Sequence, residues 1–275
     1  MISQKEREIR SIFKPQRTNT FEDQGQSSEA GGSSNTGTPP MTTISTEHKP
    51  QPGSRFSWAH PPMDFLLGPL MLAAAETGNT KRVAYGLECI RNINFADHQK
   101  ETALHKAAAN GHEDIVQILL NKGASAKAMN ESGNTPLHCA ATGGHTSTVE
   151  LLLSKRASIA AMSKANETPL HSAVKGGHTS IAEILLLNGA SIEATDIFSN
   201  TPLHLAARDG HTSTVELLLT KGALTEAVNS DRHTPLHLAT VRRRCGVAEL
   251  LRSKGAKLAI LETCEEYLDS DGDNP

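Results

Sequence analysis

The strongest constraint in this sequence is a short motif that returns every 33 residues. It reads Thr-Ala-Leu-His in its first copy and Thr-Pro-Leu-His in the later four. The five copies begin at Thr102, Thr135, Thr168, Thr201 and Thr234. The decapeptide GHTSTVELLL also occurs unchanged at 144–153 and 210–219. A fixed period of this length predicts a solenoid, in which each unit buries its apolar face against its neighbours.

Each unit has the sequence signals of two helices. Thr135 can act as an N-cap, because its hydroxyl can accept from an early helix amide. Pro136 then stands at the first helical position, where its missing N–H costs nothing. His138 occupies the capping-box position and can return a hydrogen bond to the threonine. Gly143-Gly144 ends the first helix, and the apolar spacing of 149–153 predicts a second. The same capping role is predicted for Thr102, His105, Thr135, His138, Thr168, His171, Thr201, His204, Thr234 and His237.

The order Thr-Pro-Leu-His, Ala-Ala, Gly-His, Val-x-x-Leu-Leu, Gly-Ala resembles the ankyrin repeat. The resemblance predicts an all-α solenoid of stacked helix-turn-helix units with β-turn fingers. Leu72 stands where the motif histidine would be in a worn first copy that includes Pro69. Arg156 replaces the glycine of the later turn in its unit, which is not expected to disturb the fold. The repeat domain is predicted over 64–261, as units 64–96, 97–129, 130–162, 163–195, 196–228 and 229–261.

The resemblance implies a protein-binding function carried by finger tips and by the exposed side of each first helix. The finger tips on this sequence are His98, Gln99, Glu131, Ser132, Lys164, Ala165, Ile197, Phe198, Ser230 and Asp231. The groove positions are Ala109, Asn110, Thr142, Lys175, Arg208, Asp209, Val241 and Arg242. The pair Ile197-Phe198 is the candidate hot spot, because aromatic side chains dominate interface energies. The alternative is that Phe198 packs on the neighbouring finger.

The thirteen histidines raise the question of a metal site. Nine of them recur at repeat positions, five in the Thr-Pro-Leu-His motif and four after the turn glycine: His112, His145, His178 and His211. Packed helices lie roughly 8–10 Å apart, whereas a zinc–nitrogen bond is about 2 Å long. One ion therefore cannot join equivalent histidines of neighbouring units, and a structural capping role is predicted for all nine. No cofactor is expected.

No catalytic motif accompanies the repeats. The sequence has no G-x-S-x-G elbow, no P-loop and no HExxH pattern. We therefore predict a protein without enzymatic activity. The net charge of −3 argues against a nucleic-acid-binding domain.

The chain lacks an apolar run long enough to cross a membrane, since Asp64, Gly68 and Pro69 interrupt the stretch 63–76. The four cysteines form no CxxC pair and the segment 1–13 has no secretory pattern, so reduced thiols are expected. The prediction is a cytoplasmic or nuclear monomer.

Two segments flank the predicted repeats. In residues 1–62, Gly, Pro, Ser, Thr and Gln fill 33 positions, which predicts disorder. A short partner-binding helix over 5–13 is the alternative there. Residues 262–275 contain six acidic side chains and no basic one, which predicts a mobile acidic tail.

Three consecutive arginines, Arg242 to Arg244, interrupt the last repeat. Arg243 stands where earlier units have the turn glycine, and Arg244 stands where they have the histidine. Because a left-handed backbone costs a non-glycine residue roughly 1–2 kcal/mol, this turn is expected to adopt another shape. We interpret it as a degenerate capping turn. Contact with the acidic tail or with an acidic partner is the alternative, and three basic residues are too few for a typical nuclear import signal.

The favoured function is an interaction scaffold or adaptor that holds partner proteins in the groove. A second hypothesis is masking of a transcription factor, since the layout is similar to the inhibitor-of-κB proteins. Their DSGxxS motif is absent from 1–62, however. A third is a specificity or regulatory subunit of an enzyme complex such as a ubiquitin ligase, although no recruiting motif is present.

Overall fold

The structure is a computed structural model that describes residues 63–257. The disorder predicted for 1–62, the short helix over 5–13 and the acidic tail at 262–275 all lie outside the described residues. Within that range, no helix is long and apolar enough to cross a membrane.

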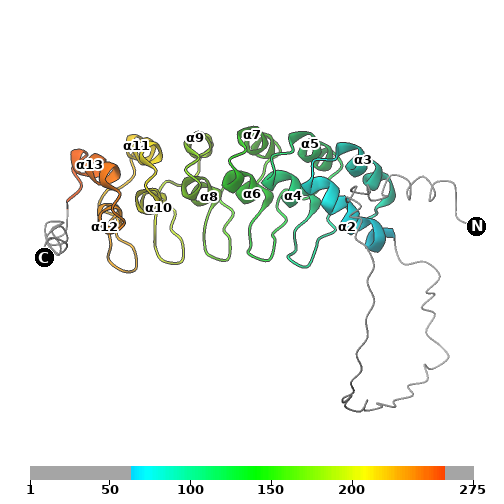
Figure 1. Cartoon of the computed structure of the whole chain (residues 1–275), viewed down its shortest axis with the longest axis horizontal. Coiled ribbons are helices and arrows are strands. Elements are labelled where there is room, and N and C mark those ends of the chain that lie inside the picture. Colours follow the sequence, from blue (N-terminus) through cyan, green and yellow to red (C-terminus); the bar gives the residue numbers. More distant parts are fainter. Residues whose placement is uncertain (1–62, 258–275) are drawn as a thin grey trace, which may run out of the picture. The chain divides into compact units, whose positions relative to one another are not determined.

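The described chain folds into twelve helices arranged as six successive pairs (Figure 1). The pairs are α2 (Met63–Glu76) with α3 (Thr80–Cys89), α4 (Ala103–Ala109) with α5 (Glu113–Asn121), α6 (Pro136–Gly143) with α7 (Thr146–Ser154), α8 (Pro169–Lys175) with α9 (Thr179–Leu187), α10 (Pro202–Asp209) with α11 (Thr212–Thr220), and α12 (Pro235–Val241) with α13 (Cys245–Ser253). The only strand pairing between described residues is an isolated bridge of Ala96 with Thr102. The predicted all-α solenoid is confirmed.

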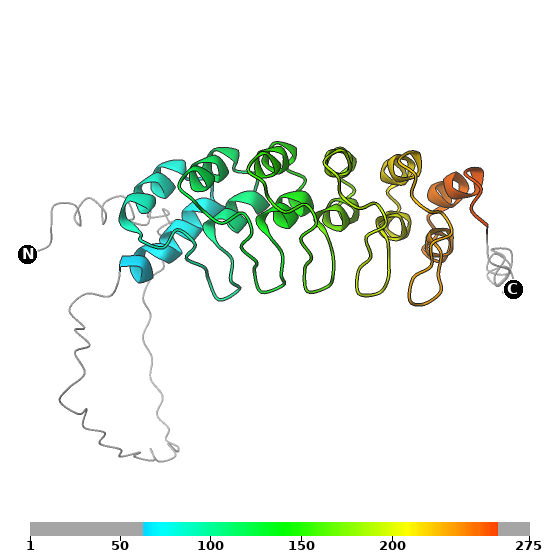
Figure 2. The ribbon, with the colours of Figure 1, turned by 180° about the vertical axis from the view of Figure 1, so that it is seen from behind.

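The helices form two layers. In the inner layer, each of the helices α2, α4, α6, α8, α10 and α12 packs on the next. The outer layer is built in the same way from α3, α5, α7, α9, α11 and α13. Long loops project from the inner layer between successive pairs, and these are the fingers (Figure 2). The solenoid therefore presents three surfaces: the fingers, the exposed side of the inner helices and the outer helices.

The core combines small and large apolar side chains from both layers. Inner helices contribute buried alanines such as Ala140, Ala141 and Ala207, which allow neighbouring helices to approach closely. Outer helices contribute larger side chains such as Leu152 and Leu185, both fully buried. Burying one such leucine is worth about 1.5–3 kcal/mol relative to leaving it exposed. The 33-residue period thus becomes one continuous core through the stack.

The first pair differs from the others at its start. Helix α2 begins at Met63, six residues before Pro69, and Pro69 lies inside it. The other inner helices start directly after the motif threonine, which acts as their N-cap. No threonine stands at this point of the first unit. Pro69 stands there instead, and α2 continues past it to Met63 although a proline inside a helix removes one backbone hydrogen bond.

The turn at Arg243 corrects the sequence-based expectation. Arg243 has a φ of 54°, in the left-handed region, like Gly144 at 78° and Gly210 at 86°. The turn between the two helices therefore keeps the shape of the earlier units, and the expectation of another shape is wrong. Arg244 Nε also donates to the carbonyl of Arg208 at 3.3 Å, where the earlier units use a histidine.

Arg156 is a second non-glycine residue in a left-handed conformation, with a φ of 62°. The equivalent Gly123, Gly189 and Gly222 have φ near 90°, and the space that a Cβ would occupy is open at all three. We expect Arg156→Gly to raise the free energy of unfolding by about 1 kcal/mol, because only backbone strain is removed. Urea denaturation followed by circular dichroism measures it. Lys155→Gly is the control, since Lys155 has a φ of −91° and glycine relieves nothing there. A loss of stability in Arg156→Gly would contradict the assignment of strain.

Candidate interaction surface

The motif threonine and histidine form a capping box at four inner helices. In the third unit, the amide of Thr135 donates to His138 Nδ1 at 3.1 Å, and Thr135 Oγ1 lies 2.9 Å from the same nitrogen. His138 Nε2 donates to the carbonyl of Glu167 in the next finger at 3.0 Å. Because Nδ1 accepts from a backbone amide, the proton of the neutral ring is on Nε2. Each such histidine therefore caps one helix and holds the following finger.

The other three boxes repeat these bonds. His105 Nε2 reaches the carbonyl of Asn134 at 3.0 Å, His171 that of Asn200 at 3.4 Å, and His204 that of His233 at 3.0 Å. All four rings are buried, and burial lowers the pKa of His105, His138, His171 and His204, although nearby carbonyls and carboxylates oppose the shift. These histidines are neutral structural groups.

The last motif copy is different. Thr234 Oγ1 accepts from the amide of His237 at 3.2 Å, which caps the start of α12. The His237 ring stacks on His233, with ring centres 4.1 Å apart and planes 7° apart. No further described finger follows this helix.

The histidines after the turn glycine link neighbouring units and do not cap their own helices. His112, His145, His178 and His211 stand at N-cap positions, but their side chains make no capping bond. Their Nε2 atoms instead lie 3.0–3.1 Å from carbonyls 36 residues earlier: Glu76, Ala109, Thr142 and Lys175. The predicted capping role is therefore wrong for these four. The reason is orientation, since each ring points back across the stack.

The fingers are held by a recurring side-chain motif at their base. Asp196 Oδ1 accepts from the amides of Phe198 and Asn200, both at 2.8 Å. Asp97, Asn130, Ser163 and Asn229 make the same pair of bonds in their own fingers. Sequence reasoning missed these residues, although they recur with the same 33-residue period.

Successive fingers are also joined through their backbones. The amide of Glu131 donates to Gln99, that of Lys164 to Ser132, that of Ile197 to Ala165 and that of Ser230 to Phe198, at 2.7–3.0 Å. These bonds join backbone atoms and do not involve the side chains at the finger tips. The fingers therefore form a connected row.

The predicted finger-tip residues are all exposed except Ala165, which is half-buried. Ile197 is 52% exposed and Phe198 is 58% exposed. Phe198 is therefore not covered by the neighbouring finger. Its own backbone holds that finger while its ring remains exposed to solvent.

The predicted groove positions are exposed, except Arg208 and Asp209, which are half-buried. Arg208 and Asp209 form a bidentate pair at 2.9 and 3.0 Å, and Lys175 pairs with Glu167 at 2.8 Å. Near the first finger, Lys106 lies 2.6 Å from Glu101, a bond that raises the pKa of the lysine. Three of the eight predicted groove positions, Lys175, Arg208 and Asp209, therefore take part in ion pairs. Val241 is an exposed apolar residue among the others, 58% exposed.

Three apolar side chains that the sequence analysis did not select also lie on the fingers. Met129, Met162 and Val228 are 52%, 54% and 58% exposed, and each directly precedes a finger-base residue. They occupy the same place in the repeat, so the period itself could have revealed them. Together with Ile197 and Phe198 they place exposed apolar side chains both early and late along the row of fingers.

Cys139 lies on an inner helix between these surfaces. Burial raises the pKa of its thiol to about 12, and nearby Glu101 adds to the shift. A thiol so rarely ionised at neutral pH is a poor nucleophile or metal ligand. Among residues 63–257, no three His, Cys, Asp or Glu side chains come close enough to hold a metal ion.

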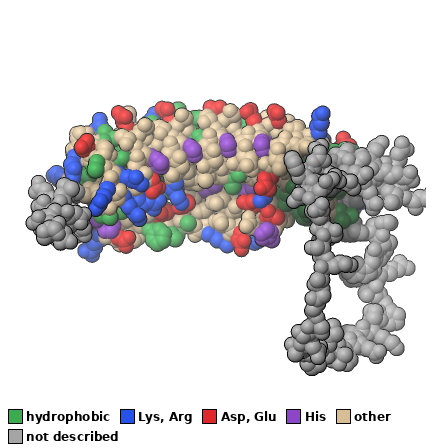
Figure 3. Space-filling model, viewed as in Figure 1, with side chains coloured by type: hydrophobic (Ala, Val, Ile, Leu, Met, Phe, Trp, Pro, Cys, Tyr) green, Lys and Arg blue, Asp and Glu red, His purple; other side chains and the backbone are tan. Residues whose placement is uncertain are grey.

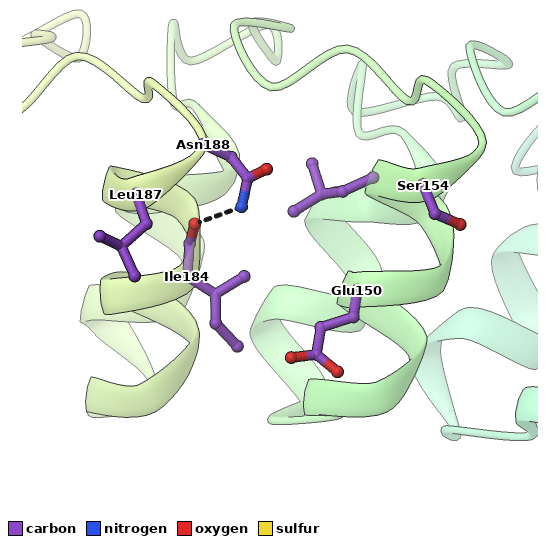
Figure 4. Close-up of a pocket in the computed structure, with 6 residues that line it drawn as sticks. Glu150, Ser154, Ile184, Leu187 and Asn188 are labelled. Atoms are coloured by element: carbon purple, nitrogen blue, oxygen red, sulfur yellow. Dashed lines mark hydrogen bonds between the residues drawn. The ribbon is translucent and has the colours of Figure 1, made fainter.

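A shallow depression between α7 and α9 faces away from the fingers. Figure 4 shows Glu150 and Ser154 on one side and Ile184, Leu187 and Asn188 on the other. Asn188 Nδ2 donates to the carbonyl of Ile184 at 2.8 Å, so its amide is already engaged. Small-molecule sites bring several polar groups to a common point within a concave pocket. This depression does not.

Comparison with known proteins identifies the repeats. The family described as "Ankyrin repeats (3 copies)" matches residues 70–163, 126–196 and 170–261. A mouse protein, the 60 kDa lysophospholipase of Mus musculus, is 40% identical over 60 residues. That match spans 22% of this chain and 11% of the mouse protein, which is less than two 33-residue repeats.

Proposed function

The chain belongs to the ankyrin repeat family, and from this premise we propose that it is an adaptor that holds partner proteins in its groove. Ankyrin repeats are protein–protein interaction modules. The finger tips and the inner-helix positions Ala109, Asn110, Thr142, Lys175 and Val241 would form the contact surface. The short match to the lysophospholipase falls within repeats and brings no activity to this chain.

The exposure of Phe198 is the observation that carries the proposal. An aromatic side chain that is 58% exposed on a backbone held by two neighbouring fingers is a rigid apolar anchor. Ile197 beside it and Val228 on the next finger extend the apolar area. Anchors of this kind contribute most of the binding energy at protein interfaces.

The test is capture of partners by the intact chain and by Phe198→Ala. The side chain is exposed and buries little area within the fold, so the variant should keep its helical circular dichroism. If Phe198 is a hot spot, its loss costs about 2 kcal/mol or more, which is roughly 30-fold in Kd. Captured proteins should therefore be strongly depleted, as measured by quantitative mass spectrometry.

Leu187→Ala is the matched control. Leu187 is 69% exposed but lies on α9 in the outer layer, away from the fingers. It should capture the same proteins as the unchanged chain. Equal capture by all three chains would remove the finger-tip anchor from the proposal.

A further inference from the structure

Positive charge is concentrated in the last helix pair. Residues 229–257 carry seven basic side chains against two acidic ones, Asp231 and Glu249. The basic ones are Arg232, Arg242, Arg243, Arg244, Arg252, Lys254 and Lys257. In each of the five earlier units, acidic residues equal or outnumber basic ones. Figure 3 shows Lys and Arg side chains gathered toward the α12–α13 end of the array.

These seven basic side chains are exposed, and none is within ion-pair distance of a carboxylate of residues 63–257. Among the earlier basic residues, Lys106, Lys175, Arg208 and Lys221 do form ion pairs with carboxylates. The hydrogen bond from Arg244 to the Arg208 carbonyl of the preceding unit leaves the positive charge of Arg244 uncompensated. The last repeat thus presents an excess of positive charge whose seven basic side chains form no ion pair with a described carboxylate.

The same end is also less completely covered than the inner repeats. Leu238 and Thr240 are half-buried, whereas their equivalents Leu205 and Ala207 are 1% and 0% exposed. His237 is half-buried too, while His204 is fully buried. The inner residues are covered by the next unit, and no further helix pair follows α13 in the described range. The surface therefore combines a basic rim with a partly apolar face.

One segment of the chain has the matching chemistry. Residues 262–275 carry six carboxylates and no basic residue, and they include the apolar pair Tyr267-Leu268. They start five residues after Lys257, the last described residue. Fourteen extended residues span up to about 46–50 Å, whereas a nine-residue helix such as α13 is about 14 Å long. The segment can thus reach both ends of the last helix pair.

We propose that residues 262–275 bind back onto the basic α12–α13 end of their own repeat array. Their carboxylates pair with the exposed arginines and lysines, and Tyr267-Leu268 cover the half-buried face around Leu238. A tether this short gives an effective concentration in the millimolar range, so individually weak contacts suffice. This contact is independent of the finger-tip surface of the proposed function.

Two native cysteines allow a direct test in the full chain. Cys245 is exposed at the start of α13, next to the arginine turn, and Cys264 lies in the acidic segment. A short bismaleimide should join them within one chain, and mass spectrometry identifies the linked peptides. Raising the salt from about 0.05 M to about 1 M shortens the screening length to roughly 3 Å and should lower the yield of this product.

Charge variants make the test specific. Arg242→Glu with Arg243→Glu should lower the Cys245–Cys264 yield by about fivefold or more, since each exposed ion pair contributes modestly. Replacing the six acids by their amides should do the same: Glu262→Gln, Glu265→Gln, Glu266→Gln, Asp269→Asn, Asp271→Asn and Asp273→Asn. Lys122→Glu with Lys127→Glu makes the same charge change on earlier exposed lysines and should leave the yield unchanged.

Two results would overturn the proposal. A yield that is the same in all variants and at both salt concentrations means that the segment does not dock, and the basic end is left for an acidic segment of another protein. A product that joins isotopically distinct copies of the chain in a mixture, in place of the product within one chain, assigns the surface to a second copy.

Discussion

Below about pH 6.5 the repeat array is expected to lose stability steeply, before its carboxylates begin to titrate. His105, His138, His171 and His204 are neutral in the fold, because Nδ1 of each accepts a backbone amide and burial lowers each pKa. In the unfolded chain their pKa returns to about 6.5. The unfolded state therefore binds more protons than the folded state below that pH.

The sign follows from linkage. Stability rises with pH wherever the unfolded state binds more protons, so the contribution of these histidines is complete above pH 6.5. It is lost progressively as the pH falls from 6.5 toward the lowered pKa of each folded histidine. The slope contributed by each histidine is at most about 1.4 kcal/mol per pH unit, and all four act in the same direction. Urea denaturation at a series of pH values between about 7.5 and 5 measures this slope.

His138→Gln separates this effect from general acid sensitivity. Glutamine is an ordinary capping-box residue but does not titrate, so the variant should have a shallower pH dependence despite lower stability at neutral pH. His98→Gln, at an exposed finger tip, is the matched control. Equal urea midpoints at both ends of the pH range would show that the buried histidines do not govern acid stability.

The local part of the fold was predictable because each unit is determined by neighbouring residues. Thr135, Pro136 and His138 set the start of α6 within four positions of the chain, and the same logic applies at Thr102, Thr168 and Thr201. Contacts between units were not predictable in this way. The His145 ring bonds to the carbonyl of Ala109, 36 residues earlier. This bond depends on how one helix pair is oriented on the preceding pair.

The finger surface was predictable in position but not in environment. The period locates Phe198 at a tip, yet its exposure depends on how closely the next finger approaches, and that finger bonds its backbone and leaves its ring uncovered. The prediction of a different turn shape at Arg243 failed because it considered only the residue itself and not its surroundings. Its intrinsic preference disfavours a left-handed backbone, but the bonds of Arg244 and of the flanking helices hold the turn in its repeated shape.

Arg243 shows that a side chain is accepted in the turn between the two helices of the last pair. The glycines at the same position of the earlier pairs should be far less replaceable. Gly144 has a φ of 78°, and a Cβ there would lie 2.6 Å from Cε1 of His178 in the next unit. That ring holds the carbonyl of Thr142 at 3.0 Å, so an added methyl group pushes against a bond between units. No described unit follows Arg243, and this explains why a side chain is accepted there and not at Gly144.

We expect Gly144→Ala to lower the free energy of unfolding by about 2–4 kcal/mol, the sum of backbone strain and overpacking. Gly222→Ala is the matched control, since its φ is 91° and nothing lies within 4 Å of a Cβ placed there. It should lose only the strain of about 1–2 kcal/mol. Arg243→Gly should change stability in the opposite direction, by up to about 1 kcal/mol.

The difference between the two alanine variants isolates the contact with His178. Urea denaturation followed by circular dichroism gives all three free energies under one set of conditions. Equal losses in Gly144→Ala and Gly222→Ala would mean that the His178 ring moves aside without cost. In that case the glycines of these turns would be required for their backbone conformation alone. A lower stability of Arg243→Gly would contradict the assignment of backbone strain at Arg243.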